Sequence, residues 1–289
     1  MDQVVTEQPA ALGGPDDQSP SDADQEPAAA GADAAQQSVI SGCPPGLEHL
    51  AVAHRIKIKQ QVELAEVLTG LETANHYILL NEQNQQIYAA AEQSDCLARC
   101  CCGASRAFDM LLIDNQRMEV ARFVRHYRCC GMGWCSCWSR CCLQRMDVTR
   151  SGQLLGVVTQ DPRPCSTSIS VRTAEGSTAL RVRRGCCRCT VSVPCCTCCC
   201  PGCREVSFTI SAEEDGRQVG VVTKKWSGAA RELLTDADSF SLELQRDLDV
   251  RVKLGALAAV FLIDFMFFEQ NGMSQKGRSG PGSCCCCCC

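Results

Sequence analysis

Apolar and polar side chains alternate in short runs between Gly46 and Glu269, and most of these runs are joined in pairs by Asn, Asp or Gly. Runs rich in β-branched residues, separated by turn-forming residues at short spacing, are typical of antiparallel hairpins. The predicted pairs are Tyr77–Leu80 with Gln86–Ala89, Phe108–Ile113 with Met118–Val124, Met146–Thr149 with Leu154–Thr159, Ser168–Arg172 with Thr178–Val182, and Val206–Ile210 with Gln218–Thr223.

Many strands in one sheet leave edges that must be hidden, and closure into a barrel is the simplest way to hide them. We therefore predict a mostly β fold, with a closed antiparallel barrel as its architecture. Two of the return strands are alike, because Gly152–Thr159 and Gly216–Thr223 both end in Gly-Val-Val-Thr. One such match indicates similar hairpins rather than a repeat architecture.

The segment Leu254–Phe268 differs from the strands, because it is apolar on every side except at Asp264. A helix of this kind either spans a membrane or fills the centre of a protein. Residues Val252–Phe268 would extend about 25 Å at roughly 1.5 Å per residue, which is less than a hydrocarbon core of about 30 Å. Because a large barrel also needs its interior filled, we favour a buried central helix.

Charge and composition divide the chain into three parts. The first 40 residues hold eight Asp or Glu and no Lys or Arg, and the whole chain has a formal net charge of −5. We predict a disordered acidic tail over residues 1–45, a folded domain over residues 46–270, and a flexible linker with a run of cysteines over residues 271–289. The acidic balance and the 5% aromatic content argue against specific nucleic-acid binding.

The chain has 27 cysteines, an odd number and a high one. Because Met1–Leu12 has neither the basic nor the apolar region of a signal peptide, we expect reduced thiols rather than a secreted disulfide scaffold. Such thiols serve as metal ligands, lipid-acceptor sites or small buried side chains.

Several stretches resemble the phospholipid scramblase family. They are Pro45–Glu48, Glu66–Thr73, Cys141–Gln144, Thr235–Phe240, Asp247–Val250 and Phe261–Glu269, the last reading FLIDFMFFE. The resemblance implies a tubby-like fold, in which about twelve antiparallel strands close around a hydrophobic C-terminal helix. It also implies calcium-dependent, ATP-independent movement of phospholipids between leaflets by a protein that palmitate attaches to the membrane.

By this resemblance, a calcium site falls on residues 236–247. Calcium takes six to eight oxygen ligands, and the carboxylates here are Asp236, Asp238 and Asp247, with the carbonyl of Leu242 as a further candidate. Ser241 stands where such loops need Gly, so we expect weak binding. The alternation of Phe240, Leu242 and Leu244 is equally typical of a strand, and we favour that interpretation of the segment.

The resemblance also implies that the second cysteine cluster accepts palmitate. This cluster consists of Cys129, Cys130, Cys135, Cys137, Cys141 and Cys142. An acyl chain combined with basic residues or a second chain holds a protein stably on an anionic membrane. Zinc is the less favoured alternative in the third cluster, where Cys186, Cys189, Cys195 and Cys198 form two C-x2-C pairs.

The remaining motifs are weak. The chain has no G-x-S-x-G, Walker A or H-E-x-x-H motif, so we expect no catalytic constellation. The acidic tail lacks the P-x-x-P motifs that would support a role as a ligand of SH3-type domains. Lys224-Lys225-Trp226 lies where the family has a proposed nuclear-import segment, but a solvated strand end is the favoured interpretation, so a nuclear pool is weakly supported.

These expectations combine into a phospholipid scramblase at the cytoplasmic leaflet of the plasma membrane, with phospholipids and the anionic membrane surface as its partners. In this hypothesis, Asp264 marks a polar path for the headgroup, because an ionisable residue in an apolar segment is usually functional. The alternative is a palmitoylated, membrane-tethered binding or signalling module without transport activity. A helix sealed inside a barrel favours the alternative, because it cannot line a path across the bilayer.

Overall fold

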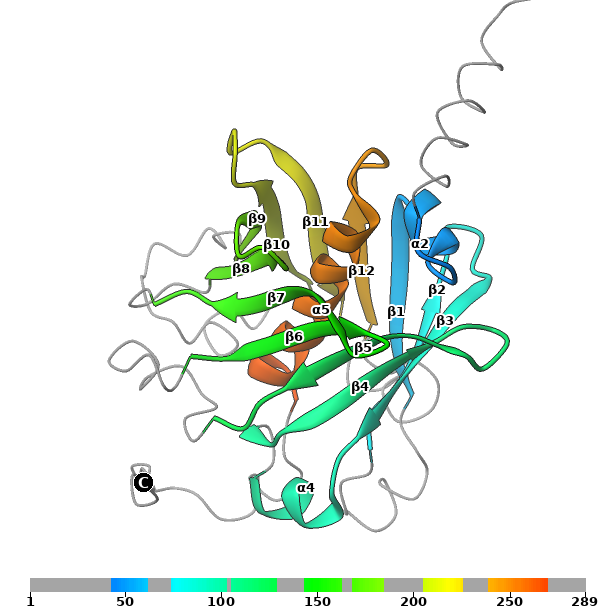
Figure 1. Cartoon of the computed structure of the whole chain (residues 1–289), viewed down its shortest axis with the longest axis vertical. Helices are drawn as coiled ribbons and strands as arrows, with labels where there is room; N and C mark the ends of the chain where they lie inside the picture. The colour runs from blue at the N-terminus through cyan, green and yellow to red at the C-terminus, as the bar shows by residue number, and fades with distance from the viewer. Residues whose placement is uncertain are drawn as a thin grey trace, which may run out of the picture.

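The computed structural model describes residues 43–61, 74–102, 105–128, 143–162, 168–184, 205–225 and 239–269. Within these residues, twelve antiparallel strands form a closed barrel around one long helix, α5 (Figure 1). The predicted mostly β fold, closed around a hydrophobic C-terminal helix, is confirmed. In chain order the elements are α2 (Glu48–Val52), β1 (Arg55–Gln61), β2 (His76–Leu80), β3 (Gln86–Gln93), α4 (Cys96–Cys102), β4 (Phe108–Ile113), β5 (Glu119–Arg125), β6 (Arg145–Arg150), β7 (Gln153–Gln160), β8 (Ser168–Thr173), β9 (Thr178–Arg184), β10 (Glu205–Ala212), β11 (Gln218–Lys225), β12 (Ser239–Leu244) and α5 (Val250–Phe267).

Each strand pairs with the strands that precede and follow it in the sequence, and β1 closes the barrel by pairing with both β2 and β12. The five predicted hairpins are β2–β3, β4–β5, β6–β7, β8–β9 and β10–β11. Their turns contain backbone conformations with positive φ, for example at Ser151 and Gly152 between β6 and β7. Two consecutive residues of this kind match the right-handed twist of the flanking strands, which is why such pairs connect hairpins.

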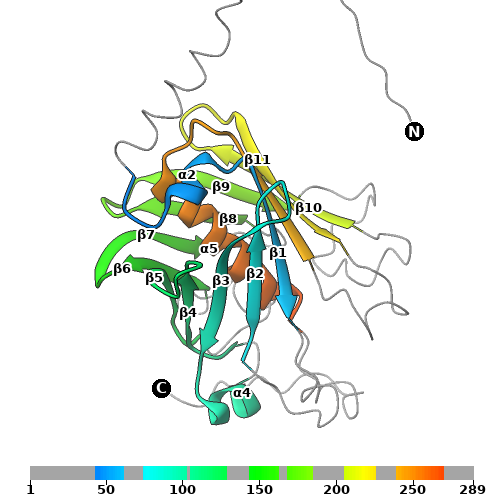
Figure 2. The same ribbon diagram turned by 90° about the vertical axis from the view of Figure 1, so that its right-hand side faces the viewer.

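The barrel has two different ends. The hairpin turns gather at one of them, together with α2 and the start of α5, and we call it the turn end. We call the other the exit end, because α5 leaves the barrel there; α4 lies at this end, far from α2 (Figure 2). Six connections begin and end at the exit end. They run from β1 to β2, from β3 to β4, from β5 to β6, from β7 to β8, from β9 to β10 and from β11 to β12.

Alternate side chains of every strand point inward, and α5 fills the space between them. All residues of the helix from Leu254 to Ile263 are buried, including Gly255, which has no side chain. The prediction of a buried central helix is confirmed, and the helix begins at Val250, four residues before the predicted apolar segment Leu254–Phe268. Val250 and Val252 belong to this helix. Among the residues described, no helix is both long enough and apolar enough to cross a bilayer.

The two similar return strands share a close approach to a neighbouring strand. A Cβ atom on Gly156 of β7 would lie 2.7 Å from the carbonyl oxygen of Arg172 on β8. A Cβ atom on Gly220 of β11 would lie 2.3 Å from the carbonyl oxygen of Glu243 on β12. The matching glycines therefore occupy equivalent places in two hairpins, where any side chain would collide with backbone.

Packing between α5 and the barrel leaves no room for a side chain at Gly255, where an added Cβ would lie 2.4 Å from Cγ1 of Val171 on β8. We predict that Gly255→Ala lowers the free energy of unfolding by about 1–3 kcal/mol, since overpacking outweighs the better helix propensity of Ala of about 1 kcal/mol. Val171→Ala should relieve the clash, so urea denaturation should show the double variant to be less destabilised than the sum of the single variants. Additive effects of the two substitutions would contradict the predicted contact.

Candidate functional site

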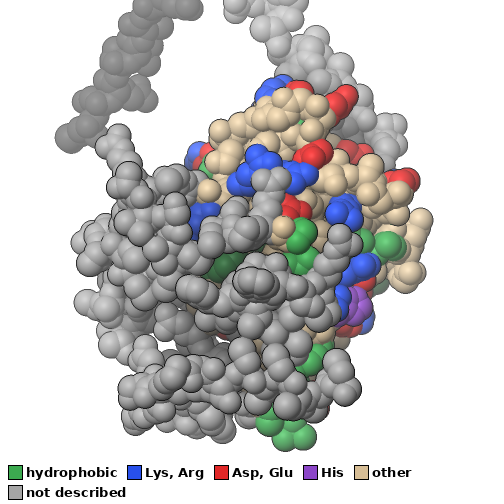
Figure 3. Space-filling model, turned by 90° about the vertical axis from the view of Figure 1, so that its left-hand side faces the viewer, with side chains coloured by type: hydrophobic (Ala, Val, Ile, Leu, Met, Phe, Trp, Pro, Cys, Tyr) green, Lys and Arg blue, Asp and Glu red, His purple; other side chains and the backbone are tan. Residues whose placement is uncertain are grey.

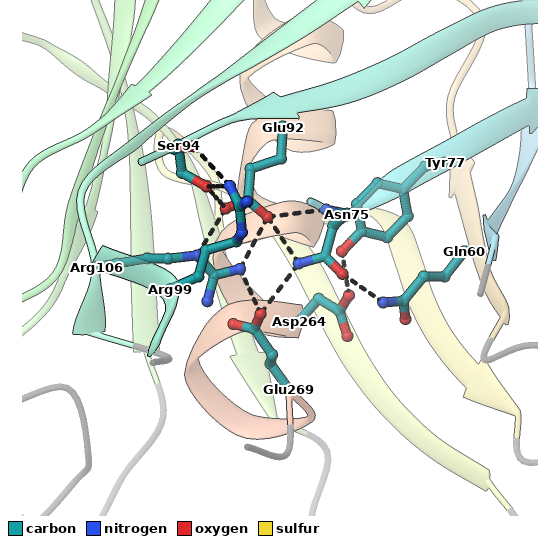
Figure 4. A network of polar contacts seen from close by, with 9 residues as sticks. All are labelled: Gln60, Asn75, Tyr77, Glu92, Ser94, Arg99, Arg106, Asp264 and Glu269. Atoms are coloured by element: carbon teal, nitrogen blue, oxygen red, sulfur yellow. Dashed lines mark hydrogen bonds and ion pairs between the residues drawn. The ribbon is translucent and has the colours of Figure 1, made fainter. Parts of the chain in front are cut away.

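Charged side chains gather inside the barrel at the exit end, around the last turns of α5 (Figure 4). The period of two along each strand places them there. Glu92 follows Ala90 on the inner face of β3, Arg125 follows Phe123 on β5, and Lys224 follows Val222 on β11. Strand geometry therefore aims these charges at the core, and each needs a partner there because an unpaired buried charge is costly.

Asp264 on α5 accepts hydrogen bonds from two of the strands. The hydroxyl of Tyr77 on β2 lies 2.7 Å from its Oδ2, and Nζ of Lys224 on β11 lies 3.2 Å from its Oδ1. Both charged side chains are withdrawn from solvent, with 0% of the Lys224 side chain and 5% of the Asp264 side chain exposed. The Lys224 ammonium also lies 4.5 Å and 4.3 Å from the ring centres of Phe240 and Phe268, within the range of cation–π attraction.

A second group of contacts centres on Arg106, which precedes β4. Its guanidinium donates to both carboxylate oxygens of Glu92, at 2.6 Å and 2.8 Å, and to Oε1 of Glu269, at 2.6 Å. The side-chain amide of Asn75 donates to the same two carboxylates, at 2.9 Å and 3.0 Å. Gln60 on β1 donates in turn to the amide oxygen of Asn75 at 2.7 Å. The network therefore connects β1, β3 and the start of β4 to Glu269, two residues after the end of α5.

Arg125 extends the polar cluster toward β6. Its guanidinium donates to Oε1 of Gln144 at 2.6 Å and 3.2 Å, and it lies 5.6 Å from the ring centre of Phe265 on α5. Arg106 lies 5.1 Å from the same ring on another side. Two cations thus contact one aromatic side chain of the central helix.

Burial and pairing act in opposite directions on the pKa values of the cluster. Burial alone would raise the pKa of Glu92, but the hydrogen bonds and charge of Arg106 outweigh it and lower that pKa. For Glu269, burial prevails over Arg106 and raises the pKa to about 7. Its Oε2 atom is buried and has no hydrogen-bond partner among the described residues. Burial lowers the pKa of Arg125 to about 10, and burial beside Asp264 raises the pKa of Tyr77 well above its ordinary value.

Lys253 fixes the opposite end of the central helix. Its Nζ donates to three backbone carbonyls, those of Ala51 at 2.5 Å, Arg246 at 3.0 Å and Ala53 at 3.3 Å. Burial lowers the pKa of this ammonium to about 8. The side chain of Asp249 caps the helix by accepting from the backbone N–H of Arg251 at 2.7 Å. Buried cations therefore hold α5 at the turn end as well as at the exit end.

The arrangement positions the central helix. The polar cluster consists of three acids, Glu92, Asp264 and Glu269, and three bases, Arg106, Arg125 and Lys224, gathered inside the barrel. Their contacts connect α5 to β1, β2, β3, β4, β5 and β11. Among the described residues, no group of three His, Cys, Asp or Glu side chains is placed to hold a metal ion.

The residues singled out from the sequence fall in different places. Asp264 lies in the polar cluster, inside the barrel rather than on a face that could touch lipid. Leu242 is a buried residue of β12, paired with Ile56 and Val222, so the strand interpretation of this segment is confirmed over Ser239–Leu244. Asp247 lies in the connection from β12 to α5, at the turn end. Asp236 and Asp238 lie outside the described residues.

The predicted acceptors of palmitate also lie outside the described residues, as do the cysteines of the zinc alternative. These acceptors are Cys129, Cys130, Cys135, Cys137, Cys141 and Cys142. Calcium, palmitate and zinc therefore stay predictions.

One interpretation needs correction. The sequence predicts a solvated strand end at Lys224, with an import segment as the less favoured interpretation, but the Lys224 side chain is completely buried and contacts Asp264. Only Lys225, whose side chain points to the other face of β11, is exposed. Sequence-based reasoning also missed the buried charges Glu92, Arg106, Arg125 and Lys253. For Glu92, Arg125 and Lys224, the available signal is a charged residue at an inward-facing position of a predicted strand.

Comparison with known proteins places the chain among lipid-handling relatives. The sequence profile of the family described as Scramblase matches residues 34–270. Human phospholipid scramblase 1 is 41% identical over 239 residues, which cover 82% of this chain and 70% of that protein. Human phospholipid scramblase 2 is 40% identical over 229 residues, covering 79% of this chain and 72% of that protein. Human phospholipid scramblase family member 5 is 36% identical over 229 residues, covering 79% of each. No solved structure gives a significant match.

Removing one member of the Lys224–Asp264 pair should be far more harmful than removing both. We predict that Asp264→Leu lowers the free energy of unfolding by about 3–5 kcal/mol, because it leaves Lys224 buried without its acid. The double variant Lys224→Met/Asp264→Leu should recover most of that loss in chemical denaturation. As a control, Glu243→Leu, which breaks the exposed Arg55–Glu243 pair, should change stability by less than about 1 kcal/mol. A double variant as unstable as Asp264→Leu would contradict the pairing.

The raised pKa of Glu269 predicts a pH dependence of known sign. Between the ordinary value of 4.5 and about 7, the folded chain binds a proton that the unfolded chain has released, so stability falls as pH rises through this window. Glu269→Gln cannot ionise and keeps an acceptor for Arg106 and Asn75. Thermal denaturation should show the wild-type chain losing stability relative to this variant between pH 5 and pH 8. Glu92 titrates in both proteins at lower pH, so it cancels; a constant difference would rule out the ionisation of buried Glu269.

Proposed function

The chain belongs to the phospholipid scramblase family, and on that premise we propose that it moves phospholipids between membrane leaflets in a calcium-dependent, ATP-independent way. The observation that carries this proposal is the extent of the similarity, because the family profile runs through the whole barrel and to the end of α5. Phospholipids and the membrane surface are then its partners, and translocation rather than bond-breaking chemistry is its activity.

The position of α5 constrains the route that a headgroup can take. The helix fills the barrel, and its only acidic residue, Asp264, is engaged by Tyr77 and Lys224. Withdrawing the helix would separate a buried ion pair, at a cost of about 3–5 kcal/mol, and would empty the core. We therefore favour a route along the outside of the barrel, with α5 in place, over a route lined by Asp264.

Calcium control is proposed at the exit end. Asp238 directly precedes β12, whereas Asp247 follows its far end, and six residues of extended strand span about 20 Å at roughly 3.3 Å per residue. One ion cannot be coordinated by both carboxylates while β12 stays paired. We propose that Asp236 and Asp238 contribute to a weak calcium site that does not include Asp247 or the carbonyl of Leu242.

Attachment to the membrane is proposed to depend on palmitate at the second cysteine cluster, defined above as the six cysteines between residues 129 and 142. Arg125, which precedes this cluster, faces the barrel interior, and Arg122 is paired with Asp109 and Glu119. These two arginines therefore contribute little to the attraction of an anionic membrane surface, so membrane binding depends more on the acyl chains. The cytoplasmic leaflet of the plasma membrane is the proposed location.

A second function has one observation in its favour. A filled barrel whose central helix is held by buried ion pairs at its exit end is a rigid body, and such a body suits a membrane-tethered binding or signalling module that transports nothing. The same acyl anchor and the same fold would serve either function.

Proteoliposomes that contain the full-length chain separate the two functions. With a fluorescent phospholipid in both leaflets, addition of calcium should make the inner-leaflet label accessible to dithionite. Asp236→Ala/Asp238→Ala should reduce the calcium-dependent rate several-fold at a fixed calcium concentration, and Asp247→Ala, a matched loss of an acid at the turn end, should not. Traces with calcium that match protein-free vesicles would refute translocation and favour the tethered module.

A further inference from the structure

The connections that hold nearly all of the cysteines start and finish at one end of the barrel. The connections from β3 to β4, from β5 to β6, from β7 to β8 and from β9 to β10 all begin and end at the exit end, and α5 leaves the barrel there. Every cysteine except Cys43 belongs to one of these connections or to the residues after α5. Cys43 alone precedes α2, at the turn end. The cysteines form separate clusters in the sequence, whereas the strands that flank these connections all end or begin at the exit end.

The charged residues are also distributed unequally between the two ends. The connections at the turn end, which are the hairpin turns and the link from β12 to α5, carry eight Asp or Glu and three Arg. By contrast, the six connections at the exit end together carry eight Asp or Glu and eight Arg, and the three of them that hold the cysteine clusters carry six Arg and one acid, Asp95; one of these arginines, Arg106, is buried. An anionic bilayer is therefore repelled by the acidic turn end more than by the exit end, whose connections hold acids and arginines in equal number.

The described part of this surface is α4, which projects from the exit end (Figure 1). The thiols of Cys96 and Cys101 on this helix are free and exposed. Leu97 lies one helical turn before Cys101, and 71% of its surface is exposed, which is the largest exposure among the large apolar side chains described. In the space-filling view, hydrophobic side chains stand out at the bottom of the molecule, at the level of α4 (Figure 3).

The exposed face of α4 is held in place by its polar side. Arg99 on α4 donates to the backbone carbonyl of Ser94 at 2.6 Å and to its hydroxyl at 3.1 Å, and Ser94 donates to Glu92 of the polar cluster. Tyr127, which follows β5 at the same end, is 55% exposed. Two exposed apolar side chains and two exposed thiols thus stand at the exit end on a firmly attached scaffold.

From these observations we propose that the exit end faces the membrane and that Cys96 and Cys101 of α4 are S-acylation sites, with Leu97, on the same helix face as Cys101, in contact with lipid. The inference rests on the proposed function for the presence of a membrane, and it adds a modification site outside the second cysteine cluster. In the reaction, the Sγ of each cysteine attacks the thioester carbonyl of an acyl-coenzyme A. A new S–C bond forms, the bond to the coenzyme sulfur breaks, and the thiol proton ends on the released coenzyme thiol.

The site has a physical consequence for attachment. One acyl chain gives marginal, reversible membrane binding, whereas two chains or a chain with a further apolar or basic contact give stable binding. Acyl chains on α4 and on the connection from β5 to β6 leave the barrel at the same end. They therefore fix the barrel with its turn end, which carries α2 and the acidic turns, away from the bilayer.

Site-resolved acyl exchange tests the modification. The full-length chain is expressed in eukaryotic cells, free thiols are blocked, thioesters are cleaved with hydroxylamine, and the freed cysteines are located by mass spectrometry. We expect hydroxylamine-dependent label on Cys96 and Cys101, retained when the six cysteines of the second cluster are changed to Ser. The matched control is Ser177→Cys, an exposed thiol at the turn end, which should stay unlabelled.

The outcomes separate this inference from the proposed function. Label confined to residues 129–142 would overturn acylation of α4 while leaving the palmitate anchor intact. Equal label on Ser177→Cys and on Cys96 would overturn the membrane-facing exit end, because it would show acylation of any exposed thiol. Absence of acylation anywhere on the chain would overturn both the anchor and this inference, whereas a failure of lipid translocation alone would leave the α4 result unaffected.

Photo-crosslinking tests the orientation of the barrel by a second readout, the yield of lipid adducts, which does not depend on detecting thioesters. A benzophenone amino acid is placed at Leu97 or Tyr127 at the exit end, and at Met118 or Leu154 at the turn end, all of them exposed positions. With the acylated protein on vesicles of phosphatidylcholine and phosphatidylserine, we expect lipid adducts at least several-fold more abundant from the first two positions. Equal yields, or higher yields from the turn end, would overturn the proposed orientation.

Discussion

The closed barrel has an interior that only a helix can fill, and the rest of the structure depends on that constraint. Twelve strands enclose more space than their own inward side chains occupy, and α5 supplies the missing volume with side chains that are almost all apolar. The fit is close enough that Gly255 cannot accept a methyl group without moving Val171. The helix is therefore part of the core in the same sense as the strands, and the barrel is not expected to persist without it.

Electrostatics then fixes where the helix sits along the barrel axis. Apolar packing alone tolerates sliding, whereas a buried charge is stable only next to its partner. Lys253 meets backbone carbonyls at the turn end, and Asp264 and Glu269 meet Lys224 and Arg106 at the exit end. These contacts set the position of α5 along the barrel axis. Through Ser94, Arg99 and Glu92, the same network also fixes the orientation of α4. The same polar cluster thus connects the core to the surface that we propose to face lipid.

Much of the fold could be predicted from the sequence, because the strand period and the turn residues were strong. Alternation interrupted by Asn, Asp or Gly predicted the hairpins from Tyr77 to Thr223. The central helix was predicted from a run that is shorter than a membrane span and apolar on nearly every side, as the centre of a protein requires. β1 was missed because RIKIKQQ offers only Ile56 and Ile58 as apolar positions, and α2 and α4 are too short to show a helical period. The buried charges were missed for a deeper reason. Whether Glu92 or Arg125 is solvated depends on partners distant in sequence, such as Glu269 and Gln144, and only the closed barrel brings them together.

Hydrogen exchange on the membrane-bound, full-length chain tests most directly whether α5 stays inside the barrel while the protein works. If it does, the backbone amides of Leu254–Phe265 exchange as slowly as those of the central strands, with and without calcium, because both are exposed only by global unfolding. If these amides exchange much faster than the strands when calcium and phospholipid vesicles are present, the helix leaves the barrel, and the account of a sealed core held by buried ion pairs is wrong.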